Sequence, residues 1–381
     1  MGERPALLCV LGTRPEAIKM APLILKLKET SRFVVRILAS GQHTDMLYQA
    51  LEDFGICADA DLNVMKDRQT LDHITSAVLE GVGTFLDANP QDMLLVHGDT
   101  TTTLSAALAG FYRKIPIAHV EAGLRSRNMD CPFPEEANRV LVDRIATLYF
   151  APTRQSADNL TAEGVAADRV FLTGNTVIDA LFWTLERREE TTILREIPKD
   201  ASLVLMTAHR RESWGVPLSR ICGAVSDLLK EHDDLWFLIP LHKNPVVREV
   251  IKKELGDCPR VIFTEPLRYP DFVAAMNRSL FIMSDSGGIQ EEASALRKPV
   301  LILRELSERP EALTAGTGRL VGTKRERIGE EASRLLNDPS WLASFSERGM
   351  PFGDGTASER ILEVIEKYFD NYFAGSRHGC R

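Results

Sequence analysis

Cysteine is sparse in this chain and never closely paired. The six cysteines are scattered over 381 residues, and no two of them form a C-x-x-C motif. Zinc sites and disulfide frameworks both need cysteines at short or repeated spacings. We therefore expect no disulfide framework and no metal site. Free thiols are typical of a reducing compartment, which predicts a cytoplasmic protein.

Long apolar runs and basic stripes are missing as well. No stretch of about 18 apolar residues occurs, the length that a transmembrane helix requires, so we expect no contact with a membrane. The chain holds 46 Lys and Arg against 54 Asp and Glu, a net charge of -8. Proteins that bind nucleic acid usually present a basic face, so no nucleic-acid partner is predicted. An anionic ligand would need a local site made of a few Arg, Lys, His and helix ends.

A dinucleotide fingerprint is also absent. No G-x-G-x-x-G motif follows a predicted strand, and Gly316, Gly318 and Gly322 have the wrong spacing and position for one. That motif lets the backbone approach the diphosphate of a nicotinamide cofactor. The sequence therefore predicts an activity that uses no cofactor.

Short β-branched runs alternate with longer helical patterns along the whole chain. This alternation is typical of βαβ units, in which helices cover both faces of a parallel sheet. Strands are predicted at 6–11, 33–39, 93–97, 115–120, 203–207, 235–240, 261–263, 280–283 and 300–303. Helices are predicted at 16–28, 70–86, 101–111 and 358–368.

The strand pattern restarts near residue 203, and the length suits two domains. We predict an α/β protein with two Rossmann-like doubly wound domains that face a cleft. The predicted domains are residues 1–175 and 176–356, with the boundary near 174–179 or in the charged helix that follows. Open α/β sheets bind ligands beyond the carboxyl ends of their strands, so functional residues should follow strands directly.

Charged residues after the first predicted strand suit an anion. Gly12-Thr13-Arg14-Pro15-Glu16 follows this strand, and Lys19 lies one turn further on. A glycine turn, a proline near the helix start and an Arg/Lys pair at the helix mouth favour an anionic ligand. The alternative is a plain strand-to-helix turn with solvated charges.

Three carboxylates lie at the ends of predicted elements. Asp99 and Glu121 each follow a strand, and Glu135 opens a helix. Carboxylates grouped around one anionic substrate raise one another's pKa and can exchange protons, so we predict that these three are acid–base catalysts. The alternatives are that Asp99 caps its helix and that Glu135 only interacts with the dipole of its helix.

Two segments of the second half predict a diphosphate site. His209 and Arg210 end its first strand, where Arg offers forked donors to phosphate and His can add charge or a proton. Ser286-Gly287-Gly288 follows a later strand and opens a helix, so backbone N–H groups and the helix dipole can meet a phosphate. Glu292, one turn into that helix, can accept from two ribose hydroxyls. The alternative is a tight turn without a ligand.

These motifs together resemble one family. The chain is similar to the non-hydrolysing UDP-N-acetylglucosamine 2-epimerases of bacteria and archaea, with matching stretches in family order over nearly the whole chain. The stretches are GTRPEAIKMAPLI (12–24), GQH (41–43), KDRQTL (66–71), VHGDTTTT (96–103), HVEAGLRS (119–126), FPEEANR (133–139), TGNTVIDAL (173–181), TAHRRES (207–213), HKNPVVRE (242–249), SDSGGIQEEA (284–293) and ERPEALTAGT (308–317).

The resemblance implies a GT-B type fold, in which the last helix, here 357–373, crosses back to the first domain. It also implies a homodimer whose ligands are UDP-N-acetylglucosamine and UDP. The implied catalytic residues are Asp99, Glu121, Glu135 and His209. The implied substrate-binding residues are Arg14, Lys19, Arg139, Phe272, Ser286, Gly287, Gly288, Glu292 and Arg309. A second, activating UDP-N-acetylglucosamine molecule would contact Gln42, Arg68, Gln69, Glu136, Arg210 and His242.

At five positions the chain departs from the family pattern. Asp45 stands where a longer Glu or Gln is usual, which bears on the regulatory contacts. Ser213 and Trp214 replace the usual Asn and an aliphatic residue or Phe. Arg297 replaces a glycine, and Ser307 replaces a threonine. None of these changes removes a proposed catalytic group.

The chemistry of the implied substrate restricts the mechanism. C2 of the sugar is not next to a carbonyl group, so inversion needs either transient oxidation or loss of the anomeric substituent. Because no site for a hydride carrier is evident, we predict elimination of UDP to 2-acetamidoglucal and re-addition, for the supply of cell-surface polysaccharide precursors. The alternatives are a hydrolysing epimerase that releases N-acetylmannosamine and UDP, a GT-B glycosyltransferase, and a UDP-sugar sensor without activity.

Overall fold

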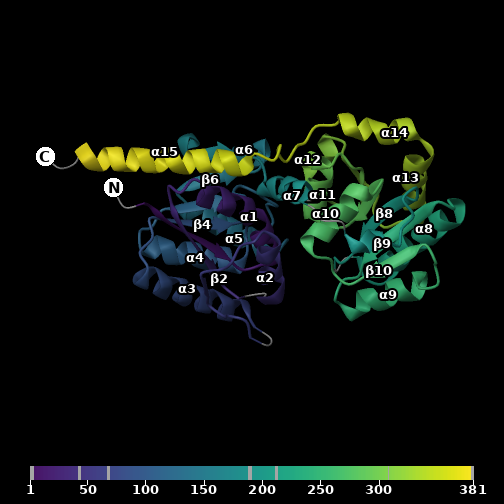
Figure 1. The fold of residues 1–381 in the computed structure, drawn as a ribbon, viewed down its shortest axis with the longest axis horizontal. Helices are drawn as coiled ribbons and strands as arrows, with labels where there is room; N and C mark the ends of the chain where they lie inside the picture. Colours follow the sequence, from purple (N-terminus) through teal and green to yellow (C-terminus); the bar gives the residue numbers. More distant parts are fainter. Residues whose placement is uncertain are drawn as a thin grey trace. The chain divides into compact units, whose positions relative to one another are not determined.

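The structure is a computed structural model that describes residues 4–41, 44–66, 69–187, 191–210, 213–307 and 309–378. The chain forms two compact units (Figure 1). The first unit comprises residues 1–182 and 353–381, and the second comprises residues 183–352. Each is an α/β unit built on one parallel sheet, which confirms the predicted fold class of two Rossmann-like doubly wound domains.

The first sheet is parallel at every recorded strand pair. Its central strands are buried on both faces, so they are continuous apolar runs such as LLCVL and MLLV. The order across the sheet is β3 (Ala60–Asp61), β2 (Val34–Ala39), β1 (Ala6–Leu11), β4 (Met93–His97), β5 (Ile117–Val120), β6 (Leu148–Ala151) and β7 (Val170–Leu172).

Three helices of the first unit pack against one another on one face of this sheet. They are α3 (Leu71–Ala88), α4 (Thr101–Tyr112) and α5 (Glu135–Ile145). Val10 and Val96 of the sheet share a buried apolar cluster with Val78, Ala106 and Val142 of these helices. The other helices of the unit are α1 (Arg14–Glu29), α2 (Thr44–Asp53), α6 (Arg154–Ala162), the start of α7 (Thr176–Glu186) and α15 (Ala357–His378).

Helix α15 packs on α1 and so belongs to the first unit. The carboxylate of Asp179 on α7 caps its start, because it accepts from the backbone N–H groups of Ala357 at 3.1 Å and Ser358 at 2.7 Å. Helix α7 continues past residue 182, where the first unit ends. The predicted domain boundary, between 175 and 176, lies at the start of the same helix and stays a prediction.

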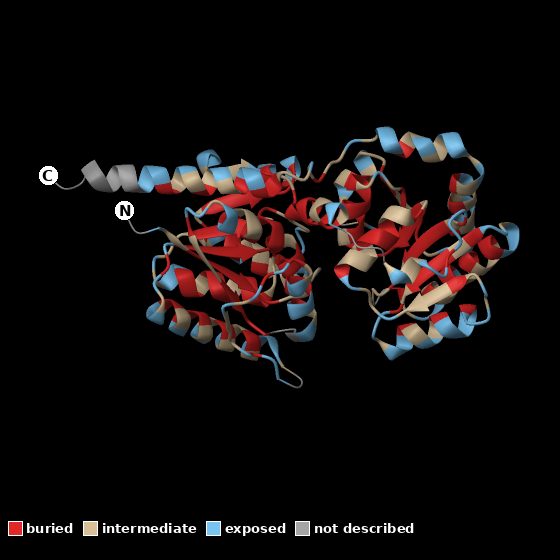
Figure 2. Cartoon of the chain, in the orientation of Figure 1, coloured by how far each residue is buried: buried red, intermediate tan, exposed pale blue. Residues whose placement is uncertain are grey.

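The second sheet is also parallel, and its core includes the fully buried side chains of Phe237, Phe281 and Phe345. Its order is β10 (Val261–Thr264), β9 (Leu235–Pro240), β8 (Ser202–Thr207), β11 (Phe281–Ser284), β12 (Val300–Ile302) and β13 (Gly318–Leu320). The helices are α8 (Val216–Glu231), α9 (Pro245–Leu255), α10 (Tyr269–Arg278), α11 (Gly287–Ala295), α12 (Pro310–Thr314), α13 (Arg325–Asn337) and α14 (Pro339–Ala343). Figure 2 shows that the central strands of both sheets are buried, whereas many exposed residues lie on the outer faces of the helices.

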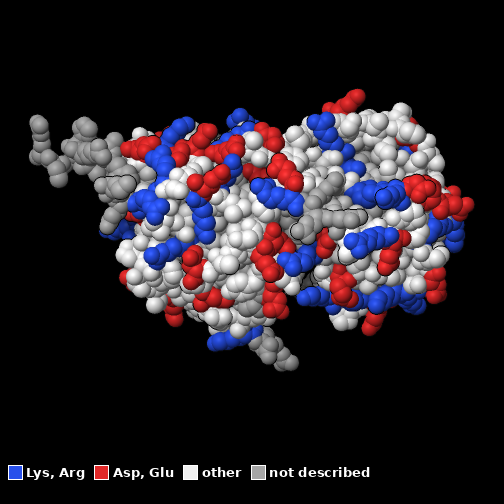
Figure 3. Space-filling model, in the orientation of Figure 1, with Lys and Arg blue, Asp and Glu red and all other residues white. Residues whose placement is uncertain are grey.

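Two further predictions concern membrane spans and a basic surface. Within the described ranges, no helix has the length and apolar character needed to span a membrane. On the face shown in Figure 3, Lys and Arg are interspersed with Asp and Glu, so this face carries no basic stripe.

Candidate active site

Each sheet has a topological switch point. In the first sheet β1 lies beside β4, and in the second β8 lies beside β11, although these strands are not consecutive in the chain. Open α/β sheets bind ligands at the carboxyl ends of such neighbouring strands. The segments after these four strands contain most of the predicted catalytic and substrate-binding residues.

A buried glutamate joins the loops after β1 and β4. Glu16 is 2% exposed, and its Oε2 accepts from the backbone N–H of Gly12 at 3.1 Å and the hydroxyl of Thr13 at 2.7 Å. Its Oε1 accepts from the hydroxyls of Thr100 and Thr103, at 2.9 and 3.0 Å. Burial raises the pKa of Glu16, and these hydrogen bonds oppose the shift. The side chain of Glu16 is therefore not a solvated charge.

Glu121 follows β5 in a strained backbone conformation. Its φ is 65°, in the left-handed region that glutamate rarely adopts. Strain of this kind is concentrated at functional sites. Its Oε2 pairs with Nζ of Lys19 on α1 and accepts from Nδ2 of Asn175 at 2.8 Å. The ammonium group of Lys19 favours the ionised form of this carboxylate.

Asp99 follows β4 and faces an arginine on α5. Its Oδ2 lies 2.5 Å from Nη2 of Arg139, and its backbone oxygen accepts from Nδ2 of Asn138 at 2.9 Å. Burial raises the pKa of Asp99, Arg139 lowers it, and the nearby charges of Glu121 and Glu135 raise it further. The structure therefore brings the three predicted carboxylates within electrostatic range of one another.

The cap of α4 is not Asp99. The side chain of Thr100 caps this helix, because its hydroxyl accepts from the backbone N–H of Thr103 at 3.1 Å. The alternative role of Asp99 as a helix cap is therefore wrong. Glu135 is the first residue of α5, so an interaction with the helix dipole remains compatible with its position.

A buried ion network lies beneath the loop after β4. His119 directs one ring nitrogen at the backbone oxygen of Gly98, at 2.8 Å, and the other at Oδ1 of Asp143, at 2.7 Å. Oδ2 of Asp143 lies 2.8 Å from Nη2 of Arg125 and accepts from the backbone N–H of Gly123 at 3.2 Å. Burial opposes ionisation of Asp143, but His119 and Arg125 lower its pKa overall. The network thus supports two left-handed turns, at Gly98 and Gly123, which glycine adopts without strain.

In the second unit, a fully buried aspartate organises the loop after β8. Oδ2 of Asp285 accepts from the backbone N–H groups of His209 and Arg210, both at 2.9 Å, and from the hydroxyl of Ser213 at 3.3 Å. Oδ1 lies 3.0 Å from Nδ1 of His209. Burial opposes ionisation, but His209 and these N–H groups hold the pKa of Asp285 below its ordinary value. Because Nδ1 faces Asp285, the Nε2 edge of His209 points away from it.

The rings of His209 and His242 are stacked, with centroids 5.8 Å apart. Nδ1 of His242 accepts from the backbone N–H of Asn244 at 3.2 Å. Burial lowers the pKa of His242, and the charge of His209 lowers it further. Trp214 also contacts this loop, since its Nε1 donates to the backbone oxygen of His209 at 3.3 Å.

Helix α11 begins without a side-chain cap. Ser286 is its N-cap residue but makes no capping hydrogen bond. Among the described residues, a β-carbon on Gly288 would meet nothing within 4 Å, and one on Gly287 would meet only the guanidinium of Arg309, at 3.8 Å. Arg309 pairs in turn with the buried carboxylate of Glu291. Uncapped N–H groups beside an oriented arginine favour a phosphate-sized anion.

Glu292 lies one turn into α11 and is 6% exposed. Its Oε1 accepts from the hydroxyl of the buried Tyr269, at 2.8 Å. Tyr269 opens α10, and Phe272 lies half-buried in the first turn of the same helix. A carboxylate that is oriented in this way can accept from the hydroxyls of a ribose.

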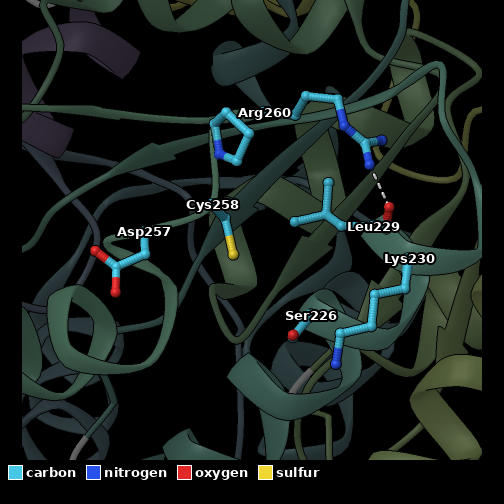
Figure 4. A pocket seen from close by; sticks show the side chains of 7 residues that line it. Ser226, Leu229, Lys230, Asp257, Cys258 and Arg260 are labelled. Atoms are coloured by element: carbon cyan, nitrogen blue, oxygen red, sulfur yellow. Dashed lines mark hydrogen bonds between the residues drawn. The ribbon is translucent and has the colours of Figure 1, made fainter.

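A separate cavity of about 180 Å³ lies elsewhere in the second unit (Figure 4). Its walls include Leu229, Lys230, Cys258 and Arg260. The guanidinium group of Arg260 donates to the backbone oxygens of Leu229, near the end of α8, and Leu235, at the start of β9. It therefore stabilises the connection between these two elements. These residues precede β9 and β10 instead of following a strand, which places the cavity away from the carboxyl edge of the sheet.

The chain is similar to known proteins over nearly its full length. Residues 25–366 match the family model described as UDP-N-acetylglucosamine 2-epimerase. The UDP-N-acetylglucosamine 2-epimerase of Escherichia coli (strain K12) is 47% identical over 367 residues, which are 94% of this chain and 98% of the relative. That of Bacillus subtilis (strain 168) is 48% identical over 357 residues, 93% of each chain.

The chain belongs to the UDP-N-acetylglucosamine 2-epimerase family. The resemblance inferred from its motifs is thereby confirmed, and so is the prediction of an isomerase. A crystal structure of the UDP-GlcNAc 2-epimerase from Neisseria meningitidis, bound to UDP-GlcNAc, has a TM-score of 0.88 to this epimerase and is 44% identical. The match covers 95% of this chain and 100% of that one.

The first unit of the epimerase gathers six predicted residues at the carboxyl edge of its sheet: Arg14, Lys19, Asp99, Glu121, Glu135 and Arg139. The second unit places eight near the ends of its strands or on α11: His209, Arg210, His242, Ser286, Gly287, Gly288, Glu292 and Arg309. Gln69 precedes α3 in the first unit. Glu136 is buried on α5 and accepts from the backbone N–H groups of Ser126 and Arg127. Gln42 and Arg68 lie outside the described residues, and the roles of all these residues stay predictions.

Sequence reasoning missed the buried partners of the predicted residues. These partners are Asn138, Asn175, Tyr269, Asp285 and Glu291, and the buried Glu16, His97 and Asp143 near the same loops were missed as well. Most of them lie inside the motifs that identify the epimerase family, and this position in the sequence could have indicated that they belong to the site. Their burial and contacts were not visible, because the partners lie far apart in the chain.

Proposed function

We propose that this epimerase is of the non-hydrolysing type and interconverts UDP-N-acetylglucosamine and UDP-N-acetylmannosamine by elimination and re-addition of UDP. The observation that carries this proposal is the unequal environment of two clustered carboxylates. Asp99 has a raised pKa, whereas Glu121 pairs with the ammonium group of Lys19. Carboxylates in unequal environments can act as proton donor and proton acceptor at the same pH. Inversion at C2 needs such a pair, since the proton leaves one face and returns to the other.

The proposed reaction has two steps. A carboxylate takes the proton from C2 while the C1–O bond breaks, and the electron pair of that bond leaves with UDP. The electrons of the C2–H bond form the C1=C2 double bond of 2-acetamidoglucal. In the second step the double bond takes a proton at C2 on the opposite face, and a phosphate oxygen of UDP attacks C1. Atoms and charges balance without a hydride carrier.

UDP has to be stabilised as a leaving group and retained until it adds again. We assign this work to Arg14, His209 and the uncapped start of α11 at Ser286-Gly287-Gly288. Asp285 holds Nδ1 of His209, so the free edge of the ring is available to the departing phosphate.

The nucleoside and the sugar have separate proposed contacts. Glu292, oriented by Tyr269, binds the ribose, and Phe272 packs near the uracil. Arg309 and Arg139 are assigned to the sugar. The Neisseria relative was solved bound to UDP-GlcNAc, and a Methanocaldococcus jannaschii relative in complex with UDP-GlcNAc and UDP, which supports these ligands.

We extend the proposal to regulation and context. A second UDP-N-acetylglucosamine molecule activates the enzyme through Gln42, Arg68, Gln69, Glu136, Arg210 and His242, and the presence of this set favours the non-hydrolysing type. The enzyme acts as a cytoplasmic homodimer and supplies precursors of cell-surface polysaccharides. Asp45 replaces a longer side chain near this regulatory set, so activation is expected to be weaker than in relatives with Glu or Gln.

The test is incubation of the full-length enzyme with UDP-N-acetylglucosamine in D2O, followed by proton NMR. Elimination and re-addition predict UDP-N-acetylmannosamine with deuterium at C2. Free N-acetylmannosamine and UDP as main products would identify a hydrolysing enzyme. UDP-N-acetylmannosamine that retains its C2 hydrogen would contradict the proton-exchange mechanism.

A further inference from the structure

His97 is the last residue of β4 and is buried beside Glu121. Its side chain is 3% exposed, and its Nε2 lies 3.8 Å from Oε2 of Glu121. Neither ring nitrogen has a hydrogen-bond partner within the part of the chain that the structure describes. A buried imidazole without a partner costs folding free energy, so its presence beside a catalytic carboxylate calls for an explanation.

Two of the groups that contact Oε2 of Glu121 are donors. They are Nζ of Lys19 and Nδ2 of Asn175. Such donors suit a carboxylate, which only accepts hydrogen bonds. A protonated Glu121 is different, because its O–H is a donor and neither of these two groups can accept from it. The protonated state therefore needs an acceptor other than Nζ of Lys19 and Nδ2 of Asn175.

The imidazole of His97 is suited to be that acceptor. Burial lowers the pKa of His97 to about 3; Glu121 raises it, whereas Lys19 and His119 lower it further. His97 is therefore neutral near pH 7, and a neutral imidazole has one ring nitrogen with a lone pair that can accept. A shift of about 1 Å would bring Nε2 and Oε2 from their present separation to hydrogen-bond distance.

We propose that His97 is a positioning residue that accepts a hydrogen bond from Glu121 in the state in which Glu121 carries the C2 proton. This inference rests on the elimination mechanism proposed above. While Glu121 is ionised, its Oε2 stays with Lys19 and Asn175. When the proton moves from C2 to Glu121, the ion pair with Lys19 weakens and the new O–H turns to His97. The imidazole itself neither gains nor loses a proton.

Two variants at position 97 separate this role from a structural one. His97→Leu keeps a similar volume but has no acceptor, and His97→Gln places an amide oxygen near the position of Nε2. In H97L we expect kcat to fall by about tenfold to a hundredfold, with KM within about twofold of wild type. The melting temperature should not fall, because an unpartnered polar group has been removed. H97Q should recover most of the lost rate.

His232→Leu is the matched control. His232 follows α8 at the amino end of β9, away from the carboxyl edge of its sheet, and its Nε2 also lacks a partner among the described residues. We expect H232L to keep the wild-type kcat. A purely structural role for His97 would instead lower the melting temperature and affect kcat and KM together.

Two results would overturn the proposal. One is an H97L enzyme with a kcat within about twofold of wild type, which is less than one hydrogen bond contributes. The other is an H97Q enzyme as slow as H97L, which would show that only the shape of histidine matters. If H97L does not fold, His97→Met replaces it. The D2O experiment on wild type is read first, so a failure of the elimination mechanism is recognised before any variant is compared.

Discussion

Oδ1 of Asp285 lies 3.0 Å from Nδ1 of His209, and Oδ2 of the same carboxylate accepts from the backbone N–H of His209 at 2.9 Å. One buried side chain thus orients both the ring and the backbone of the residue that we propose meets the leaving phosphate. Asp285 follows β11 and His209 follows β8, so this contact joins the two strands of the switch point.

We expect Asp285→Asn to lower kcat about tenfold to a hundredfold and the free energy of unfolding by about 1–3 kcal/mol. The amide oxygen can still accept from both backbone N–H groups, but the amide nitrogen would face Nδ1 of His209, which then loses its acceptor and its orientation. NMR turnover assays and urea titration measure both effects. Asp234→Asn is the control, since Asp234 holds the hydroxyl of Ser202 at the opposite edge of the same sheet. An unchanged kcat in D285N would show that His209 acts without this support.

Asp99→Asn should lower kcat by about 10²- to 10⁴-fold, the usual contribution of a general acid or base. Binding of UDP, measured by calorimetry, should remain near the wild-type affinity, because Arg14, His209 and the start of α11, to which UDP is assigned, are unchanged. Asp87→Asn makes the same chemical change in an exposed pair with Arg113 and should leave kcat unchanged. A near wild-type rate in D99N would remove Asp99 from the mechanism.

Tyr269→Phe should raise KM for UDP-N-acetylglucosamine by about three- to tenfold with little change in kcat, as expected for the loss of one hydrogen bond that orients a ligand group. The hydroxyl of Tyr269 positions Glu292, which we assign to the ribose. Steady-state kinetics measure the change, and Tyr112→Phe, at an exposed tyrosine at the end of α4, is the control. A loss in kcat at constant KM would contradict a role in nucleoside binding.

The lowered pKa of Asp143 predicts how the stability of the fold depends on pH. Its pKa is lowered in the folded state, so its ionised form stabilises the fold above the unfolded pKa of about 4, and this contribution is lost as pH falls through the lower, folded value. Asp143→Asn should therefore cost about 3–5 kcal/mol at pH 7, because it removes the buried carboxylate that pairs with both His119 and Arg125, although Arg125 keeps its pair with Glu163. It should also reduce the acid-induced loss of stability.

Urea titrations between pH 3 and pH 7 test this expectation. Asp354→Asn removes an exposed partner of Arg360 and should cost less than about 1 kcal/mol. If D143N and wild type lost stability in parallel on acidification, the acid sensitivity would have to come from other groups.

The backbone conformation of Arg297 explains why the family usually has glycine at this position. Its φ is 56°, and it follows the C-cap of α11, a left-handed position that favours glycine. Arg297→Gly should raise the free energy of unfolding by about 0.5–1 kcal/mol, although it removes the hydrogen bond to the backbone oxygen of Ser346. Thermal melts measure the gain. Arg297→Ala keeps the β-carbon and should give none, so an equal gain in R297A would place the cause in the side chain.

The long central strands could be predicted almost to the residue. The observed bounds of β1, β4 and β9 equal the predicted ones, because strands buried on both faces are continuous apolar runs. The short strands β3, β6, β7 and β13 were missed, since two to four residues carry too little pattern. These strands are recognised only through their pairing with neighbours.

The position of the site was also predictable, but the burial of its residues and the contacts between them were not. Asp99, Glu121, His209 and Ser286 directly follow strands, and parallel strands bring such residues to one edge of a sheet. That Asp285 would be fully buried could not be inferred. Charged side chains are buried only when distant groups pair with them, and the sequence does not state those distances.

The sequence by itself determined the alternation of strands and helices, the family, and the places in the chain where reactive residues follow strands. Only the tertiary structure decided which of those residues form ion pairs and which have a shifted pKa. Lys19 and Glu121 are 102 positions apart, yet they form one ion pair, and His97 beside them is kept neutral by burial. The reason is physical: ionisation depends on distance and on exclusion of water, which arise only when the chain is folded.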